Sequence, residues 1–473
     1  MVDSRTNVNL DAHPSRADDR CLGNRDRDSA SVDGCRCTVP DRDEPEDDGV
    51  DDTTQLGSDE FDDSTTTINT SQRQRHNRTQ KHIARTRRAG YQGQIQATVT
   101  TTRLMMQDFI RVADGTRSPQ TRIAVEARKY MSLLSRSRLP WLVSAEEYRA
   151  AVRTDTVDPA TLVDCTAEEA RQLLEAMSPR APLLIRGSQD FAQPGLRLES
   201  FLAYLSTKKS VDVHIYDVEV DDQGDYTQPV SLPAAEAVAL FQDDSGHPIN
   251  LLNLRNTKPN PVPAALAGIR AYSILQETSE DNGSGKATTR QYGDLANCNA
   301  FHICGKAGVF SLPHIDHHGV ITTVTCEEGK KLWLTWPPVA RAAMEEWQAS
   351  GDVAPGGSPF PILLADGDIL IQPQGRVHAP LSLENVLMSG TMHWDSREMA
   401  SVLEQSVLEA KNPGVTNEDP AKEFRARMIS IVRLWEGEHK AYPWGTQEQL
   451  AKWKEHRREW EQLNRARRRQ GRS

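Results

Sequence analysis

The sequence lacks several features that would assign it to a broad class at once. No run of about 18 apolar residues occurs in the 473 residues, so no membrane-spanning helix is expected. The first residues contain no apolar segment of the kind found in secretory signals. The seven cysteines are an odd number and include no C-x-x-C pair, which favours a reducing compartment over a disulfide-stapled secreted protein.

Lysine is missing from residues 1–70, and acidic residues are missing from the adjoining residues 71–90. Residues 1–70 have 19 Asp and Glu, 7 Arg and no Lys, whereas residues 71–90 have seven Lys and Arg and no acid. Residues 465–472 are basic again, although the whole chain has a net charge of -11. Such basic segments are typical either of solvated tails or of nuclear import and nucleic-acid contact. The second interpretation favours the nucleus over the cytoplasm, with chromatin or nucleic acid as a partner that is bound through phosphate.

Composition divides the chain into four parts. Residues 1–100 have too few apolar residues for a core and are predicted to be a disordered, acidic-then-basic tail. Residues 118–297 alternate between helical and strand patterns, with capping boxes at Ser144 and Thr166. Short β-branched strands dominate residues 298–396, and helical stripes return in residues 397–473. This pattern predicts a mainly β fold, a sandwich or barrel with flanking helices. The C-terminal stripes would form a dimerisation surface or a lid on the barrel.

Two histidines and one aspartate are the candidate metal ligands. His314 and Asp316 form an H-x-D pair, whose side chains share one face of a strand because strand side chains alternate. His378 comes much later in the chain, so it must return on a neighbouring strand to meet them. Two imidazoles and one carboxylate can occupy one face of an octahedral metal. The three open positions suit a non-haem Fe(II) oxygenase.

The residues around His378 make the pattern specific. An isolated H-x-D pair would not be, because such a pair arises easily in any soluble protein. Gly367 and Asp368 predict a turn into the apolar segment 369–371, and a second turn at Pro373 and Gly375 leads to His378. Such a hairpin would hold the imidazole at a fixed place on the sheet. His318 has the same strand parity as the H-x-D pair, so it is expected near the site or in a structural role.

An iron of this kind needs a co-substrate that supplies two electrons. A 2-oxo acid would chelate two open positions and leave one for O2, and its distal carboxylate would need a cation. Lys331 is the best candidate, because it and Lys330 have opposite parity and only one of them should face inward. Ser311 is a candidate hydroxyl donor to that carboxylate, and Thr323 is a weaker one. A solvated strand lysine is the alternative for Lys331. Further residues predicted to line the pocket are Ser389, Thr391 and His393.

The residues in these segments resemble the JmjC (Jumonji C) family of Fe(II)/2-oxoglutarate oxygenases. The strand predicted at residues 182–187 and the helix predicted at 198–205 resemble the segment before the JmjC core, and residues 387–395 resemble a fungal-type subgroup. Three blocks carry the resemblance: Ser311-x-x-His314-x-Asp316, Gly329-x-Lys331-x-Trp333-x-x-x-Pro337-Pro338, and Gly367-Asp368-x-x-x-x-Pro373-x-Gly375-x-x-His378.

The resemblance implies a double-stranded β-helix, the cupin or jelly-roll fold. It implies Fe(II) bound by His314, Asp316 and His378, and 2-oxoglutarate bound by Lys331 with help from Ser311. The implied activity is O2-dependent hydroxylation of a protein side chain, which demethylates a lysine when the methyl group is hydroxylated. Many family members carry an asparagine near the co-substrate, on the strand that follows the H-x-D pair, but residues 320–325 of this chain include none. The sequence also shows no PHD, Tudor or zinc-finger pattern.

Two alternatives to a 2-oxoglutarate enzyme stay open. The first is a non-catalytic JmjC module that binds a partner. The second is a cupin isomerase or dioxygenase that acts on small molecules without 2-oxoglutarate.

Overall fold

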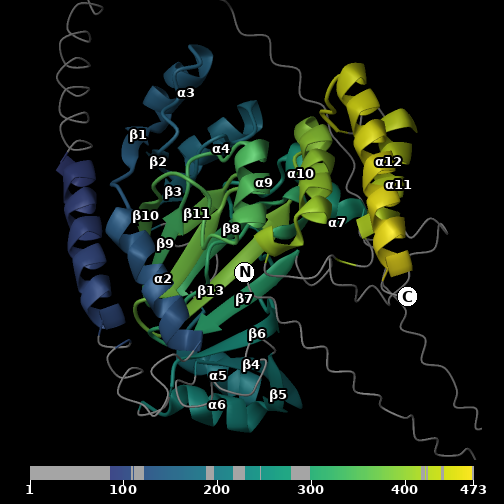
Figure 1. The fold of residues 1–473 in the computed structure, drawn as a ribbon. Coiled ribbons are helices and arrows are strands. Elements are labelled where there is room, and N and C mark those ends of the chain that lie inside the picture. The colour runs from purple at the N-terminus through teal and green to yellow at the C-terminus, as the bar shows by residue number, and fades with distance from the viewer. Residues whose placement is uncertain are drawn as a thin grey trace, which may run out of the picture. The chain divides into compact units, whose positions relative to one another are not determined.

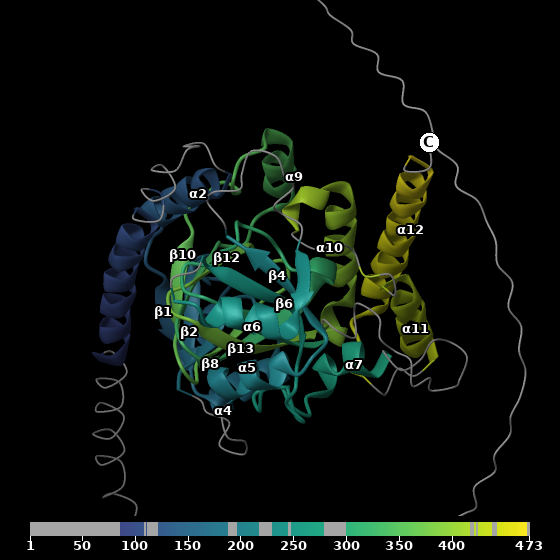
Figure 2. The same cartoon turned by 90° about the horizontal axis from the view of Figure 1, so that it is seen from below.

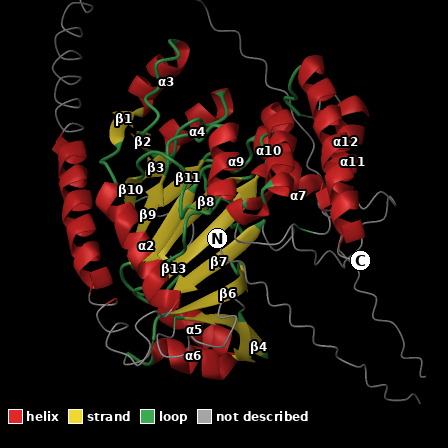
Figure 3. Cartoon of the chain, in the orientation of Figure 1, coloured by secondary structure: helices red, strands yellow, loops and turns green. Residues whose placement is uncertain are grey.

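Two β-sheets dominate the computed structural model. It describes residues 86–107, 110, 122–187, 196–216, 229–244, 247–278, 299–416, 421, 424–437 and 442–470, all of which belong to the unit spanning residues 70–473. In this part of the chain the fold is mainly β, with helices around the sheets (Figure 3). The predicted mainly β class is therefore confirmed.

The larger sheet is mixed, because β1–β2 and β2–β3 pair in parallel and its other strand pairs are antiparallel. In spatial order its ten strands are β1(Trp141–Ser144), β2(Thr161–Cys165), β3(Leu183–Ile185), β11(Ile369–Gln372), β8(Ile321–Glu328), β13(Val386–His393), β7(Ala300–Gly305), β6(Ile249–Arg255), β4(Ser210–Ile215) and β5(Val230–Pro233). The smaller, antiparallel sheet consists of β10(Phe360–Leu364), β9(Lys331–Thr335) and β12(His378–Ser382).

Helices cover the sheets from several sides (Figures 1 and 2). Figure 1 shows α5 and α6 at the β4–β5 end, and α10, α11 and α12 gathered at another side. The capping boxes at Ser144 and Thr166 are confirmed, since each side chain accepts the backbone N–H of the glutamate three residues later. Besides a helix at residues 86–107, the labelled helices of the described chain are α2(Arg122–Arg136), α3(Ala145–Arg153), α4(Ala167–Ala176), α5(Leu198–Ser206), α6(Ala234–Gln242), α7(Ile274–Thr278), α9(Arg341–Ser350), α10(Met399–Lys411), α11(Phe424–Gly437) and α12(Gln447–Gln470). Among the described helices, none is long and apolar enough to cross a bilayer.

The two sheets face each other across a shared interior. Trp333 of the smaller sheet and Val324, Leu370 and Met388 of the larger one belong to the same buried apolar cluster. Leu334, with the opposite parity on β9, packs in another cluster that includes residues of α2. Side chains therefore face this interior when they have the parity of Trp333 on β9 or of Val324 on β8.

Residues 86–107 form a helix, so the prediction of a disordered tail up to residue 100 is wrong for its last part. Tyr91 and Ile95, one helical turn apart, are both buried. The Tyr91 hydroxyl donates to the carbonyl oxygen of Leu363 at 2.9 Å and accepts the Leu363 N–H at 3.0 Å. Apolar side chains of this helix thus pack against the β core, with Tyr91 and Ile95 in the cluster that contains β10 residues, Val99 packed against that cluster, and Met106 in another cluster. Residues 1–85 lie outside the described part of the chain.

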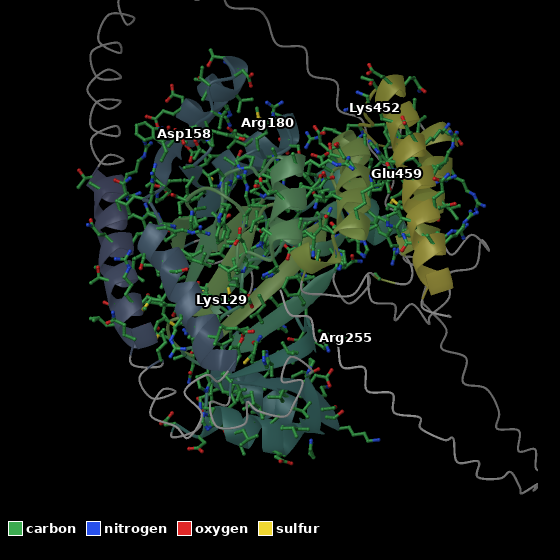
Figure 4. The ribbon with its side chains drawn as sticks, viewed as in Figure 1. Lys129, Asp158, Arg180, Arg255, Lys452 and Glu459 are labelled. Atoms are coloured by element: carbon green, nitrogen blue, oxygen red, sulfur yellow. The ribbon has the colours of Figure 1, made fainter. Side chains whose placement is uncertain are left out.

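Most charged side chains lie at the periphery of the described chain (Figure 4). The charged residues labelled there that are exposed are Lys129, Asp158, Arg180, Arg255 and Lys452. Lys331 is an exception, because it is only 4% exposed. A buried charge of this kind has a desolvation cost and therefore points to a specific role.

Replacing Gly329 with Ala should destabilise the turn that leads into β9. Gly329 has φ +93°, and an added Cβ would lie 2.2 Å from the carbonyl oxygen of Asn385. Strain and overlap should lower the free energy of unfolding by about 2–3 kcal/mol. Urea denaturation measures the change. Gly356→Ala is the matched control, because its Cβ would meet nothing within 4 Å, and an equal loss in both variants would contradict the prediction.

Candidate metal centre

His314 and His378 are joined by reciprocal backbone hydrogen bonds. The His314 N–H donates to His378 O at 3.0 Å, and the His378 N–H donates to His314 O at 2.9 Å. Directly opposed residues of an antiparallel pair extend their side chains to the same side, and the two ring centroids lie 4.3 Å apart. The prediction that His378 returns on a neighbouring strand is therefore confirmed. His378 begins β12.

Asp316 completes the group, but it does not lie on a continuing strand as predicted. The chain leaves the His314 bridge and enters a 3-10 turn at His317–Gly319, in which His318 has φ +65°. Asp316 Oδ1 lies 3.6 Å from His378 Nε2, while Oδ2 accepts a short hydrogen bond from the Thr322 hydroxyl. One ligand atom from each of the three residues lies within 4.8 Å of the others.

Hydrogen bonds define which imidazole nitrogens can act as ligands. His314 Nδ1 lies 2.8 Å from Leu312 O, and His378 Nδ1 lies 3.1 Å from Arg376 O. Because a carbonyl oxygen only accepts, His314 Nδ1 bears the proton and His314 Nε2 keeps its lone pair. The His378 ring atom on the side of Asp316 is Nε2, which lies 3.6 Å from Asp316 Oδ1. Burial lowers the pKa of His314 to about 3 and so favours the neutral, ligating form. These residues could therefore hold a metal ion, and their outer hydrogen bonds resemble those of metal-bound histidines.

Gln372 and Trp333 contact the candidate ligands His378 and Asp316 directly or through each other. The Trp333 indole N–H donates to Gln372 Oε1 at 2.8 Å, which turns the amide nitrogen toward the ligands. That nitrogen lies 3.0 Å from His378 Nδ1 and 3.4 Å from Asp316 Oδ2. The Trp333 ring also stacks on His378, with centroids 5.0 Å apart and planes 9° apart. The sequence analysis assigns no role to Gln372 or Thr322. For Gln372, a polar residue at the end of an apolar strand could have indicated a role at the site.

Lys331 faces the same interior as the candidate ligands. It has the parity of Trp333 on β9, while the Lys330 side chain is half exposed. The expectation that only one of the two lysines faces inward is confirmed. Burial lowers the pKa of Lys331 to about 8. Its ammonium donates to the Ser382 hydroxyl at 3.4 Å, and among the described residues no carboxylate forms an ion pair with it.

Ser382 is the hydroxyl that hydrogen-bonds to Lys331, and the role predicted for Ser311 as a donor to the co-substrate stays a prediction. Ser382 lies opposite Lys331 across the β9–β12 pair, and His378 lies opposite Thr335 in the same register. Ser311 lies beside this strand, since its N–H donates to Pro380 O at 2.9 Å. Pairing register decides which hydroxyl meets the lysine, and register is not written in the local pattern.

Thr323 lies on the far face of the larger sheet, so the prediction that it contacts the co-substrate is wrong. Its neighbour Thr322 has the inward parity and reaches Asp316. The Thr323 hydroxyl instead bonds to Thr391 at 2.6 Å, and Thr391 bonds to His393 Nε2 at 2.8 Å. Ser389 shares this outer face of β13 and bonds to His302. These polar residues therefore do not line the interior that holds the metal ligands.

A second group of possible ligands consists of His317, His318 and Glu409. Hydrogen bonds already use most of its polar side-chain atoms, and Glu409 Oε1 and His318 Nδ1 are the two that lack a partner in the described structure. His317 Nδ1 lies 3.0 Å from Glu409 Oε2, and its Nε2 lies 2.9 Å from the Thr416 hydroxyl. His318 Nε2 accepts the Ala421 N–H at 2.9 Å, which leaves the proton on Nδ1. Protonated Nδ1 cannot coordinate a metal, so the first group is the better candidate. His318 does not approach that group as parity suggested, because its positive φ redirects the chain.

No family model matches the chain, and no curated protein matches it either.

Acid should destabilise the protein through His393. Burial lowers the pKa of His393 to about 4, below the value of about 6.5 expected in the unfolded chain. The unfolded chain therefore binds more protons between these values, and the free energy of unfolding falls as pH is lowered through this window. The expected loss from His393 between pH 7 and pH 5.5 is about 1–2 kcal/mol.

Urea denaturation at the two pH values tests this expectation. His393→Gln removes the titrating group, so it should lose less stability between pH 7 and pH 5.5 than the wild type does. His247→Gln, at an exposed histidine, should lose as much as the wild type. An undiminished pH dependence in His393→Gln would show that this histidine is not responsible.

Proposed function

We propose that this chain is an Fe(II)- and 2-oxoglutarate-dependent dioxygenase of the JmjC type, with a double-stranded β-helix core, that hydroxylates a protein side chain. One observation carries the proposal: two imidazoles, one carboxylate and one buried lysine face the same interior between two sheets. The facing sheets and the three sequence blocks are consistent with that family.

The metal ligands would be His314 Nε2, His378 Nε2 and one oxygen of Asp316. This donor set matches the facial triad of non-haem Fe(II) oxygenases. Fe(II) bound there would supply the oxidising chemistry: one oxygen atom of O2 enters a substrate C–H bond, and the other enters succinate as 2-oxoglutarate loses CO2. The protein's own part is to keep His314 neutral, orient the three ligands and keep water away.

Lys331 is the group that would select 2-oxoglutarate. An ammonium buried without an anion is costly, and a bound carboxylate would compensate it. Ser382 lies opposite Lys331 and could donate its hydroxyl proton to the same carboxylate. The buried lysine therefore favours a 2-oxo diacid over a cupin reaction that needs no such co-substrate, and over a binding module that needs no co-substrate at all.

The substrate class and the place of action are also proposals. A protein side chain is the proposed target, and hydroxylation of an N-methyl group would lead to demethylation. The basic segments at residues 71–90 and 465–472 favour nuclear work in contact with chromatin or nucleic acid. Most of the first segment lies outside the described residues.

Removing a ligand should abolish turnover. With Fe(II), O2, 2-oxoglutarate and a peptide panel, the wild type should form succinate in a substrate-dependent way, whereas His314→Ala and Asp316→Ala should reduce this to background. His247→Ala, at an exposed histidine, is the control. Normal turnover by the two ligand variants would refute the metal assignment, and wild-type oxidation of the peptide, followed by mass spectrometry, that continues without 2-oxoglutarate would refute the co-substrate.

Lys331→Met should raise the KM for 2-oxoglutarate by at least about tenfold, because one charge-assisted contact to a carboxylate is lost. Succinate formation at varied 2-oxoglutarate concentration measures this. Lys330→Met is the matched control, since Lys330 pairs at the surface with Glu384 at 2.6 Å, and its KM should not change. Equal KM values for the two variants would remove Lys331 from the co-substrate site.

A further inference from the structure

The 3-10 turn that follows Asp316 is bound by residues from the C-terminal part of the chain. The Trp394 indole N–H donates to His318 O at 2.9 Å, and the Ala421 N–H donates to His318 Nε2. At Gly319 an added Cβ would lie 3.0 Å from the Val402 Cα of α10. The turn therefore lies directly against α10, and its position depends on that helix.

Glu409 of α10 makes two hydrogen bonds to this turn. Its Oε2 accepts the His318 N–H at 2.9 Å and lies 3.0 Å from His317 Nδ1. Both contacts are made to the two residues that directly follow Asp316. Glu409 is 4% exposed, and its Oε1, like His318 Nδ1, is buried without a hydrogen-bond partner in the described structure.

Burying a carboxylate between a helix and a turn has a desolvation cost. Apolar residues of similar size usually pack at least as stably as a buried charged group. Unlike an apolar side chain, a carboxylate accepts hydrogen bonds and so fixes the direction of two donors. The direction of the His317 and His318 backbone in turn sets where Asp316, the preceding residue, presents its oxygens.

The far side of Asp316 is fixed as well. Thr322, on β8 just after the turn, holds Asp316 Oδ2 and leaves Oδ1 toward His378. The aspartate is thus held by its own side chain on one side and by the peptide that follows it on the other. Outer hydrogen bonds of this kind commonly tune metal affinity.

We infer that Glu409 is a positioning residue of the metal centre, which acts by fixing the turn at His317–Gly319 and hence the orientation of Asp316. The inference rests on the proposed function, because it requires His314, Asp316 and His378 to bind a metal. It makes α10 part of the metal site although α10 contributes no ligand.

The test compares metal binding by Glu409→Met, Glu409→Gln and wild-type full-length protein, with Mn(II) affinity measured by EPR titration. Glu409→Met loses both acceptor contacts and should bind Mn(II) about 10–100-fold more weakly. Glu409→Gln keeps one oxygen that can accept both donors, so it should recover most of the affinity. Glu404→Met, at an exposed glutamate on the same helix, should bind as the wild type does.

The absorption spectrum of bound Co(II) separates positioning from stability alone. At saturating Co(II), Glu409→Met should show an altered d–d spectrum, while Glu404→Met should match the wild type. If Glu409→Met does not fold, His317→Ala, which removes one of the two donors, serves in the same comparison. An unchanged Mn(II) affinity and Co(II) spectrum in these variants would overturn the inference.

Three other outcomes are distinct. Wild-type protein that binds two ions and loses one in Glu409→Met would show that Glu409 is itself a ligand, which also overturns the positioning role. Folded wild-type protein that binds no Mn(II), like its His378→Ala variant, would overturn the proposed function and this inference together. Wild-type binding that is lost only in His378→Ala would leave the metal centre standing and remove Glu409 from it.

Discussion

The paired backbone hydrogen bonds between His314 and His378 are the contact on which the candidate site depends. They extend the smaller sheet by one bridge and place two imidazoles side by side, although the residues are far apart in the sequence. A one-residue slip of this pairing would turn one ring to the opposite face and separate the ligands. The rest of the site, including the stacked Trp333 and the amide of Gln372, is built around these two rings.

The interior between the sheets combines apolar packing with groups that are costly to bury. Leu370, Val324 and Met388 form an ordinary core, yet Lys331 and three candidate ligands share the same space. Burial disfavours the charged forms of the His314 imidazole and of the Lys331 ammonium, which keeps His314 ready to bind a metal and means that a charged Lys331 needs an anion. Sites that depart from the rules of stable packing in this way are commonly functional.

The C-terminal helices are part of the candidate site's support and not an independent addition. Composition separates residues 397–473 from the β core, but α10 contacts the turn after Asp316 and Trp394 bonds to the same turn. The N-terminal side behaves similarly, since the helix at residues 86–107 docks Tyr91 on β10. Segments on both sides of the β core therefore complete it.

The sequence by itself determined the local features. Segments rich in β-branched, aromatic and other apolar residues predicted β8, β9 and β11, and the S/T-x-x-E spacing predicted two helix starts. Residue type with strand parity selected the candidate ligands and Lys331 over Lys330. Only the tertiary structure decided which residues meet. Ser382 opposes Lys331, Thr322 and Gln372 reach Asp316, Thr323 faces the other way, and Glu409 holds the turn. Local pattern follows from the chemistry of neighbouring residues, whereas these contacts depend on strand register and on where a helix docks.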